Sequence, residues 1–393
     1  MKPFFIFTLL LFLPLLFACQ SNNDNRNDSQ KLINTLYLDQ KFTKPLLFEI
    51  ESEQDVFMLD HEMLTLVNEK LKNSYSPKKK ANLLLESIFS QDHIALSYAS
   101  NANMTAREAF HSKTANCMSL TIMAYALAKE AGLVVDFQQV EIPEYWIRNG
   151  QYNLLTGHIN LLIKTKDRHN KITIYGSNTL QIDFDPYVLK ESFSKKVIKK
   201  NTVLAMFYNN KGGQALVEDN YIIAYQYFKA ATQADKLFSA AWGNLAVLYK
   251  LTDNDPIAEA TYRHAIALEQ DNYTALANLA ILLRKNLAIG EANTIEHKLQ
   301  AKRNNNPYYH AVLADEAYYN QNYQQAVIHY KKAIKLNHKI HELYFGLAKV
   351  YYQMNRIPAA KKAIKKALRF NKVKFTEHLY SAKLNFLNAE QLN

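Results

Sequence analysis

Residues 105–132, TAREAFHSKTANCMSLTIMAYALAKEAG, carry the clearest helix pattern in the first half of the chain. From Cys117 onward, small and apolar side chains recur at helical spacing, which predicts a helix with one buried face. Gly132 supplies a helix stop, and Thr114 or Asn116 can cap the start by accepting a hydrogen bond from an N–H of the first turn. Cys117 is therefore expected in that turn, where the positive end of the helix dipole favours the thiolate that a nucleophilic cysteine needs.

Downstream of this helix the hydrophobic pattern alternates, which indicates strands. The expected strands are residues 134–140, 152–163, 171–175 and 180–184. Helices followed by strands indicate an α+β domain with an antiparallel sheet. His158 falls within the second strand, on the same face as Asn160. Asp183 and Asp185 follow at the end of the last strand, so a cysteine, a histidine and an acid occur in that order.

The composition bounds the kind of protein. With 393 residues, of which 48% are hydrophobic, two or three domains with real cores are expected. Gly and Pro are scarce at 9 each, which favours helices over a turn-rich β chain. The formal charge is +11, and the stretch from His341 to the end holds ten Lys or Arg against three Glu. This basic end could face anionic lipid, nucleic acid or an acidic partner, or simply form a solvated helix face.

The N-terminus has the pattern of an exported protein. Residues 1–19, MKPFFIFTLLLFLPLLFAC, combine one Lys with an apolar run too short for a stable membrane span, which is typical of a secretory signal. The ending Leu-Phe-Ala-Cys resembles the bacterial lipobox, in which Cys19 receives lipid and becomes the mature N-terminus. Phe17 is bulkier than that pattern usually has, so plain signal cleavage stays an alternative. Residues 20–30 contain no apolar side chain and are expected to form a disordered tether.

Lipidation would also imply a location. Two or three acyl chains hold a protein stably on a membrane, and Gln20 after Cys19, in place of Asp, resembles the outer-membrane signal of Gram-negative bacteria. The resemblance implies a protein of the bacterial cell envelope, lipid-anchored at the outer membrane and facing the periplasm. Cys117 would then have no intramolecular disulfide partner, which marks it as a candidate reactive thiol. Nucleic acid is not an expected partner at that location.

From residue 205 the sequence repeats itself every 34 residues. Five units superpose without a gap: 205–238, 239–272, 273–306, 307–340 and 341–374. The eighth place of each unit is small: Gly212, Ala246, Ala280, Ala314 and Ala348. The twentieth place is always alanine: Ala224, Ala258, Ala292, Ala326 and Ala360. The twenty-fourth place holds Phe228, Tyr262, Tyr330 and Ile364, but Glu296 in the third unit. Lys211 is a second departure, because apolar residues are usual at its place.

These columns resemble tetratricopeptide repeats (TPR), helix-turn-helix units whose small residues let paired helices approach closely. The resemblance implies an all-α solenoid. Residues 375–393 are expected to form a capping helix, since the ends of a solenoid expose an apolar face. Such an array offers a concave groove to a protein or peptide partner. Asn244 and Asn278 are candidate lining residues, and so is Tyr208, although a tyrosine at that place could equally be part of the packing.

Residues 31–200 are expected to form the α+β domain, and three of their motifs resemble the transglutaminase-like superfamily of papain-type cysteine enzymes. The motifs are Thr114-Ala115-Asn116-Cys117, Gly157-His158-Ile159-Asn160 and Ile182-Asp183-Phe184-Asp185-Pro186. The resemblance implies that Cys117 attacks an amide carbonyl, that His158 is its base, and that Asp183, or alternatively Asp185, orients the imidazole. The family often has Gly where this chain has Ala115. The spacing from the histidine to the aspartate is also longer than in compact members, which suggests a hairpin insertion around 167–171.

Two functions of different classes follow. The first is a membrane-anchored thiol enzyme, a cysteine peptidase, amidase or acyltransferase that works through a thioester on Cys117, with the repeats recruiting a partner or substrate. The alternative is a catalytically silent envelope scaffold that mediates protein–protein interaction through its repeats. A cysteine on an apolar helix face is most often a small buried hydrophobe, and His158 or Asp183 alone is an ordinary residue. No metal-ligand spacing or glycine-rich phosphate loop occurs, so no metal, nucleotide or other cofactor is expected.

Overall fold

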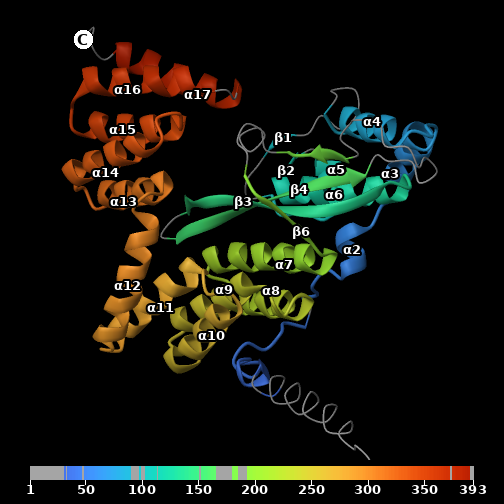
Figure 1. Ribbon diagram of the computed structural model, residues 1–393, viewed down its shortest axis with the longest axis horizontal. Coiled ribbons are helices and arrows are strands. Elements are labelled where there is room, and N and C mark those ends of the chain that lie inside the picture. Colours follow the sequence, from blue (N-terminus) through green and yellow to red (C-terminus); the bar gives the residue numbers. More distant parts are fainter. Residues whose placement is uncertain are drawn as a thin grey trace, which may run out of the picture.

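The computed structural model describes residues 31, 33–46, 48–89, 97–98, 102–112, 114–149, 152–164, 179–184, 193–371 and 374–389. A part with helices and a sheet comes first, and an array of helical hairpins follows it (Figure 1). The expected signal segment 1–19 with Cys19, the tether 20–30, the expected strand 171–175 and Asp185 lie outside the described residues.

The first part begins with helices and places Cys117 at the start of the longest of them. These elements are α2 (Glu53–Phe57), α3 (His61–Leu66), the π-helical turn η1 (Val67–Leu71), α4 (Pro77–Phe89), α5 (Ala106–Ser112) and α6 (Cys117–Glu130). Asn116 caps α6, because its side chain accepts a hydrogen bond from the Ser119 N–H. Gly132 follows the helix with a φ of 77°, a left-handed conformation that glycine adopts without strain. The predicted cap and helix stop are thus confirmed.

The sheet that follows is antiparallel, with the strand order β5-β4-β3-β6. Its strands are β3 (Val134–Asn149), β4 (Tyr152–Lys164), β5 (Thr179–Ile182) and β6 (Lys195–Ile198), and β1 (Ser97–Tyr98) pairs separately with β2 (Thr114–Ala115). β3 and β4 form a hairpin longer than its neighbours, and its distal arm reaches toward the helical array (Figure 1). Helices followed by an antiparallel sheet is the order that the hydrophobic pattern predicts.

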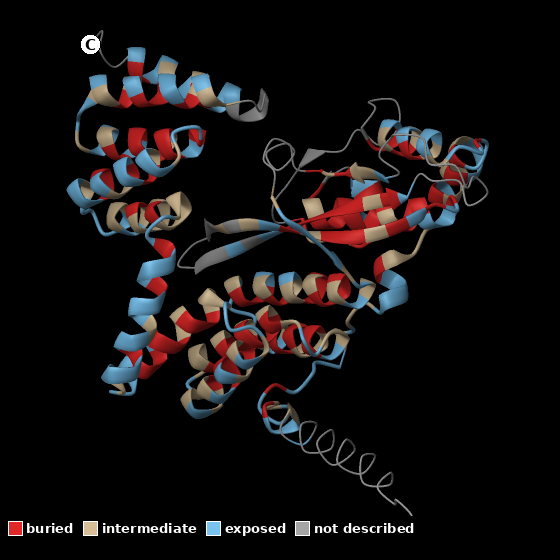
Figure 2. Cartoon of the chain, in the orientation of Figure 1, coloured by how far each residue is buried: buried red, intermediate tan, exposed pale blue. Residues whose placement is uncertain are grey.

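Helix α6 and the sheet share one buried core. Alternate residues of β4, Ile159, Leu161 and Ile163, belong to the same buried cluster as Ile122 and Leu127 of α6. Because α6 is apolar on nearly all sides, it fits a position enclosed between the sheet and the preceding helices. Figure 2 shows this region as a continuous buried block. The start of α6 is therefore fixed relative to the strand that carries His158.

The array consists of helical hairpins with the period expected from the sequence. Its helices are α7 (Lys200–Val217), α8 (Tyr221–Ala234), α9 (Ser239–Leu251), α10 (Asp255–Leu268), α11 (Tyr273–Lys285), α12 (Ile289–Arg303), α13 (Pro307–Tyr319), α14 (Tyr323–Leu336), α15 (His341–Gln353), α16 (Ile357–Phe370) and α17 (Lys374–Ala389). Units two to five begin on helix starts, whereas the first helix begins earlier than expected, at Lys200. Helix α17 buries Tyr380 and Leu387 against the fifth unit, as expected of a capping helix.

Backbone conformation repeats with the same period as the sequence. Among the residues that the structure describes, the non-glycine residues with positive φ are 34 positions apart, one in the turn of each hairpin: Asp219, Asp253, Leu287, Gln321 and Asn355. The alanines of the twentieth place are fully buried, and the large side chains of the twenty-fourth place pack beside them in units one, two, four and five. Gly212 shows why the eighth place is small, because a Cβ there would lie 2.6 Å from the Phe228 ring.

The two departures from the repeat pattern have polar partners. Lys211 forms an ion pair with Glu51, 3.1 Å between Nζ and Oε1, which ties the first helix to the segment before α2. Glu296 turns outward and pairs with Arg284 at 2.6 Å. Since Glu296 fills no core space, α12 buries little, and the hydrophobic clusters of units one to three and units four to five are separate. The array is therefore interrupted between α12 and α13.

Residues 33–46 lie against the first units of the array. Leu36 and Phe42 belong to the same buried cluster as Trp242 and Tyr249, and the Phe42 ring stacks on Tyr225 with ring centroids 4.7 Å apart. The Tyr249 hydroxyl donates to the Leu36 carbonyl oxygen at 2.7 Å. This N-terminal segment thus follows the repeats before the chain enters α2.

Replacing Leu287 with asparagine is expected to raise the free energy of unfolding by about 0.5–1 kcal/mol. Leu287 has a φ of 64° and is 83% exposed, so its side chain gains little from packing while its backbone is in a conformation that disfavours it. Asparagine tolerates that conformation. Urea unfolding measures the change, with Leu237→Asn as the matched control because Leu237 is also exposed but is not among the positive-φ residues. An equal gain in both variants would contradict the conformational explanation.

Candidate functional site

The start of α6 is held by a small hydrogen-bond network around Asn116. Its Oδ1 accepts from the Ser119 N–H at 2.8 Å, and its Nδ2 donates to Asn103 Oδ1 at 2.7 Å. The Ser119 hydroxyl donates to the Ala102 carbonyl oxygen at 3.0 Å and accepts from the Met104 N–H at 2.9 Å. These bonds fix the first turn, in which Cys117 is a partly exposed thiol.

His158 and Asp183 form a buried pair between neighbouring strands. His158 Nε2 lies 2.8 Å from Asp183 Oδ1, and the two side chains are 2% and 0% exposed. Asn160, two residues after His158 on the same face, donates from Nδ2 to Asp183 Oδ2 at 2.9 Å. Gln181 Nε2 lies 3.4 Å from the same oxygen. The carboxylate is thus bound on both oxygens, which fixes the imidazole ring it contacts.

Thr121 connects the helix start to the histidine strand. Its hydroxyl donates to the Cys117 carbonyl oxygen at 2.7 Å and lies 3.4 Å from the carbonyl oxygen of Ile159, the residue after His158. Helix α6 also packs directly on β4. The structure therefore brings the Cys117 turn alongside the strand position of His158, and His158 in turn contacts Asp183.

Cys117 begins α6, His158 lies on the neighbouring β4, and Asp183 directly follows β5. Because Asp183 contacts Nε2, a neutral His158 that donates there keeps the lone pair on Nδ1, the state in which an imidazole can accept a thiol proton. The first turn of a helix favours a thiolate, and Cys117 is the partly exposed residue of that turn. Asn160 and Thr121 were not singled out from the sequence as part of the site. Asn160 could have been, since it shares the predicted strand face with His158, whereas Thr121 depends on tertiary packing.

Of the three predicted groove residues, two form hydrogen bonds between first helices of neighbouring units, and the third is part of the packing. Asn244 Nδ2 donates to Asn209 Oδ1 at 2.8 Å, from the first helix of one unit to that of the preceding unit. Asn278 is hydrogen-bonded to Lys250, 3.3 Å between Oδ1 and Nζ, and burial lowers the pKa of that lysine. Tyr208 is instead buried and donates to the Glu51 carbonyl oxygen, so it belongs to the packing.

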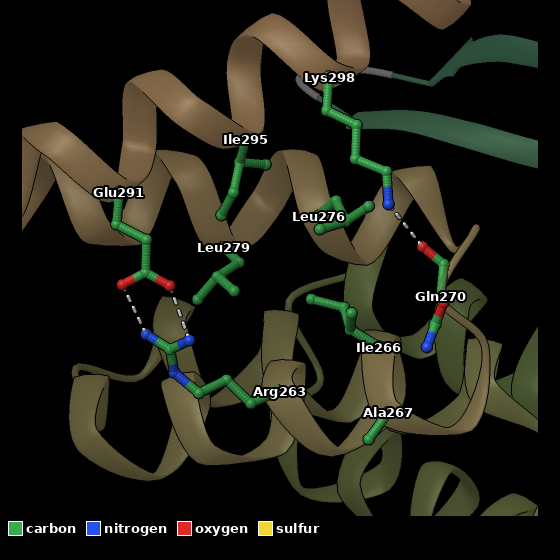
Figure 3. A pocket seen from close by; sticks show the side chains of 9 residues that line it. All are labelled: Arg263, Ile266, Ala267, Gln270, Leu276, Leu279, Glu291, Ile295 and Lys298. Atoms are coloured by element: carbon green, nitrogen blue, oxygen red, sulfur yellow. Dashed lines mark hydrogen bonds and ion pairs between the residues drawn. The ribbon is translucent and has the colours of Figure 1, made fainter.

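A separate pocket of about 470 Å³ lies between α10, α11 and α12 (Figure 3). Its apolar side chains are Ile266, Leu276, Leu279 and Ile295. Arg263 bonds to both carboxylate oxygens of Glu291, at 2.8 and 2.9 Å, and these two residues close one side of the pocket. No site residue predicted from the sequence lines it.

Among the described residues, no group of three His, Cys, Asp or Glu side chains is arranged to hold a metal ion. Within the same residues, no helix combines the length and the apolar character needed to cross a bilayer.

Comparison with protein families identifies a tetratricopeptide repeat in residues 341–373, the fifth unit. No curated protein matches the chain. Solved structures with similar helical arrays include the APC/C hetero-tetramer Cut9-Hcn1, at 19% identity and a TM-score of 0.29, covering 48% of this chain and 37% of that chain. PilF of Pseudomonas aeruginosa has 17% identity, a TM-score of 0.29, and coverage of 49% and 88%. YrrB, described as a TPR protein with an unusual peptide-binding site, has 15% identity, a TM-score of 0.25, and coverage of 46% and 92%. Such low scores carry no functional argument, and the repeat assignment rests on residues 341–373 and the 34-residue period of the chain.

Proposed function

We propose that the chain is a protein-interaction protein that binds an extended peptide segment of a partner along its first repeats. The observation that carries this proposal is the row of amides on successive first helices, Asn209 on α7, Asn244 on α9 and Asn278 on α11. A side-chain amide both donates and accepts hydrogen bonds, so it matches the N–H and C=O groups of an extended backbone. Lys250 adds a positive charge beside this row, which favours a segment containing an acidic residue.

Selection of a random 12-residue peptide library on the full chain, followed by calorimetry with the selected peptides, tests this function. Asn244→Ala combined with Asn278→Ala is expected to weaken binding at least tenfold, because a bound backbone group left without its partner costs about 1–3 kcal/mol. Gln300→Ala, an exposed residue of α12, serves as the matched control. Equal affinity of both variants would show that the amide row does not bind the peptide.

A second candidate function, acyl transfer at the thiol, is supported by the buried His158–Asp183 pair. The histidine is buried together with a carboxylate, and Asn160 holds that carboxylate in turn. Ordinary residues at the end of a strand would be solvated, so a buried pair of this kind is typical of a functional site. In the proposed reaction the Cys117 thiolate forms a bond to an amide carbonyl carbon, while His158 carries the thiol proton. His158 then gives that proton to the leaving amine as the C–N bond breaks, which leaves a thioester. Water or a second amine attacks the thioester and releases Cys117.

Alkylation of Cys117 by iodoacetamide in the full chain, followed by mass spectrometry of its peptide, tests this second function. The alkylation rate of an ordinary cysteine rises about tenfold for each unit by which the pH increases, up to its pKa of about 8.5. A thiolate already paired with an imidazolium reacts at a nearly constant rate above pH 6. The full chain is expected to show the flat profile and His158→Ala the steep one. A steep profile in the unchanged chain would leave peptide binding as the function.

We also propose that Cys19 is lipidated and anchors the chain to the envelope membrane, which rests on the lipobox-like ending of residues 1–19. Metabolic labelling with a fatty-acid analogue is expected to mark the full chain. Loss of the label in Cys19→Ser would support this site, and a label that persists would refute it.

A further inference from the structure

The β3–β4 hairpin has one irregularity, and it lies beside His158. Val140 pairs with His158, and the ladder resumes at Thr156, so residues 141–144 of β3 lie opposite Gly157 alone. A bulge of this kind bends a strand and re-aims the side chains next to it. Residues 141–144 therefore lie directly beside the strand position of His158.

The helical array holds this bulge by its last residue, Glu144. Arg303, at the end of α12, forms a bidentate pair with the Glu144 carboxylate, with Nε–Oε2 and Nη2–Oε1 distances both 2.9 Å. Asn306 donates from Nδ2 to the Glu144 carbonyl oxygen at 2.9 Å while its Oδ1 caps α13. The array thus contacts both the side chain and the backbone of Glu144.

The Arg303–Glu144 pair is more shielded than the other bidentate arginine pairs of the array. Its side chains are 11% and 19% exposed, against 45% and 46% for the equally bidentate pair of Arg263 and Glu291. Exposed pairs contribute little, whereas removal of one partner from a shielded pair leaves a charge that the protein must rearrange to solvate. Arg303 also lies over the Tyr309 ring of α13, 5.7 Å from its centroid.

The contact lies where the array itself is weakest. The hydrophobic cores of units one to three and units four to five are separate, and α12 buries few side chains between them. Helix α13 packs on β3 at this point (Figure 1). The hairpin therefore supplies packing at the junction that the repeats lack.

We propose that Glu144 and Arg303 form a latch that makes the thiol site depend on the repeat array. The latch holds residues 141–144 in one conformation and so positions His158 relative to Cys117, while the same contact fixes α13 relative to α12. Occupancy of the array by a partner that shifts α13 would thus alter thiol reactivity. The inference has two halves. The site half, that the latch positions His158, rests on the second proposed function. The brace half, that the latch fixes α13 relative to α12, does not.

Glu144→Gln in the full chain tests the latch with two readouts. The variant is expected to lower the alkylation rate of Cys117 at pH 6 at least threefold and to change the rate at pH 9 less than twofold. Only the reaction at pH 6 needs His158 in place, because at pH 9 the thiol ionises without it. Hydrogen–deuterium exchange is expected to become at least tenfold faster in peptides covering β4 and the start of α13. Arg303→Lys, which keeps the charge but loses the bidentate geometry, should show the same changes at smaller size.

Glu291→Gln is the matched control, since it removes an exposed bidentate carboxylate from the same helix as Arg303. It should leave both readouts unchanged. If Glu144→Gln keeps the flat alkylation profile that His158→Ala loses, the site half of the latch is overturned and the thiol function stands. If His158→Ala does not change the alkylation profile, the thiol function fails. The hydrogen–deuterium exchange data then test the brace half alone. Unchanged exchange in Glu144→Gln overturns the brace.

Discussion

Asp183→Ala is expected to abolish the flat alkylation profile of Cys117, lowering its rate at pH 6 about tenfold, and to reduce the free energy of unfolding by about 3 kcal/mol. The Asp183 side chain is fully buried, and its Oδ1 lies 2.8 Å from His158 Nε2. Without the carboxylate, the His158 ring and Asn160 Nδ2 lose their buried acceptor, which costs about 1–3 kcal/mol for each unsatisfied group. A ring that is no longer held in place cannot stabilise the thiolate. Iodoacetamide kinetics from pH 5 to 9 and urea unfolding measure the two effects.

Two further variants distinguish the orienting of the His158 ring by Asp183 from the effect of removing a carboxylate charge. Asp183→Asn keeps the shape but can donate to Nε2, which places the ring proton on Nδ1 and blocks acceptance of the thiol proton, so it should also give the steep profile. Asp136→Asn removes a carboxylate from an exposed pair with Lys164 on the same sheet and should change stability by less than about 0.5 kcal/mol. A flat profile in Asp183→Asn would contradict the orienting role of Asp183.

Local patterns in the sequence were enough to predict the elements that carry the site. A capped apolar helix, a β-branched alternation and a 34-residue period each depend on residues close in sequence, so α6, β4 and the repeat turns lie close to where they were expected. Asp183 has the contact with His158 that the resemblance assigned to one of two aspartates. Asp185 lies outside the described residues, so the choice between them stays a proposal.

Contacts between distant parts of the chain could not be predicted in this way. Nothing near Glu144 in the sequence indicates Arg303, because the bulge that carries Glu144 and the interruption after α12 arise independently. Phe42 likewise has no local signal for its stack on Tyr225. Lys211 looked like a weak point of the first repeat, yet its charge is matched by Glu51. Lys211 therefore marked a long-range contact, whereas Glu296, the other polar residue at a packing position, marked the interruption after α12.

Acidification is expected to loosen the capping helix α17 through His341. His341 is buried at the start of α15, and its Nδ1 lies 2.9 Å from the Tyr380 hydroxyl of α17. Burial lowers its pKa from 6.5 to about 4. The unfolded chain therefore binds this proton more readily than the native chain, so stability falls as the pH drops from about 6.5 toward 4. The loss reaches up to about 3 kcal/mol at pH 4, with Glu342 Oε1, 3.3 Å from Nε2, reducing it.

The comparison with His341→Asn separates this residue from the other groups that titrate in acid. Asparagine keeps a polar atom near the position of Nδ1 but does not titrate, so the variant should lose less stability between pH 7 and pH 4 than the unchanged chain. Hydrogen–deuterium exchange in peptides of α17 should rise with acid in the unchanged chain, after correction for the intrinsic exchange rate, and stay level in the variant. His338→Asn, at an exposed position three residues earlier, should behave like the unchanged chain. Parallel acid losses in the unchanged chain and His341→Asn would show that α17 is not held through a neutral imidazole.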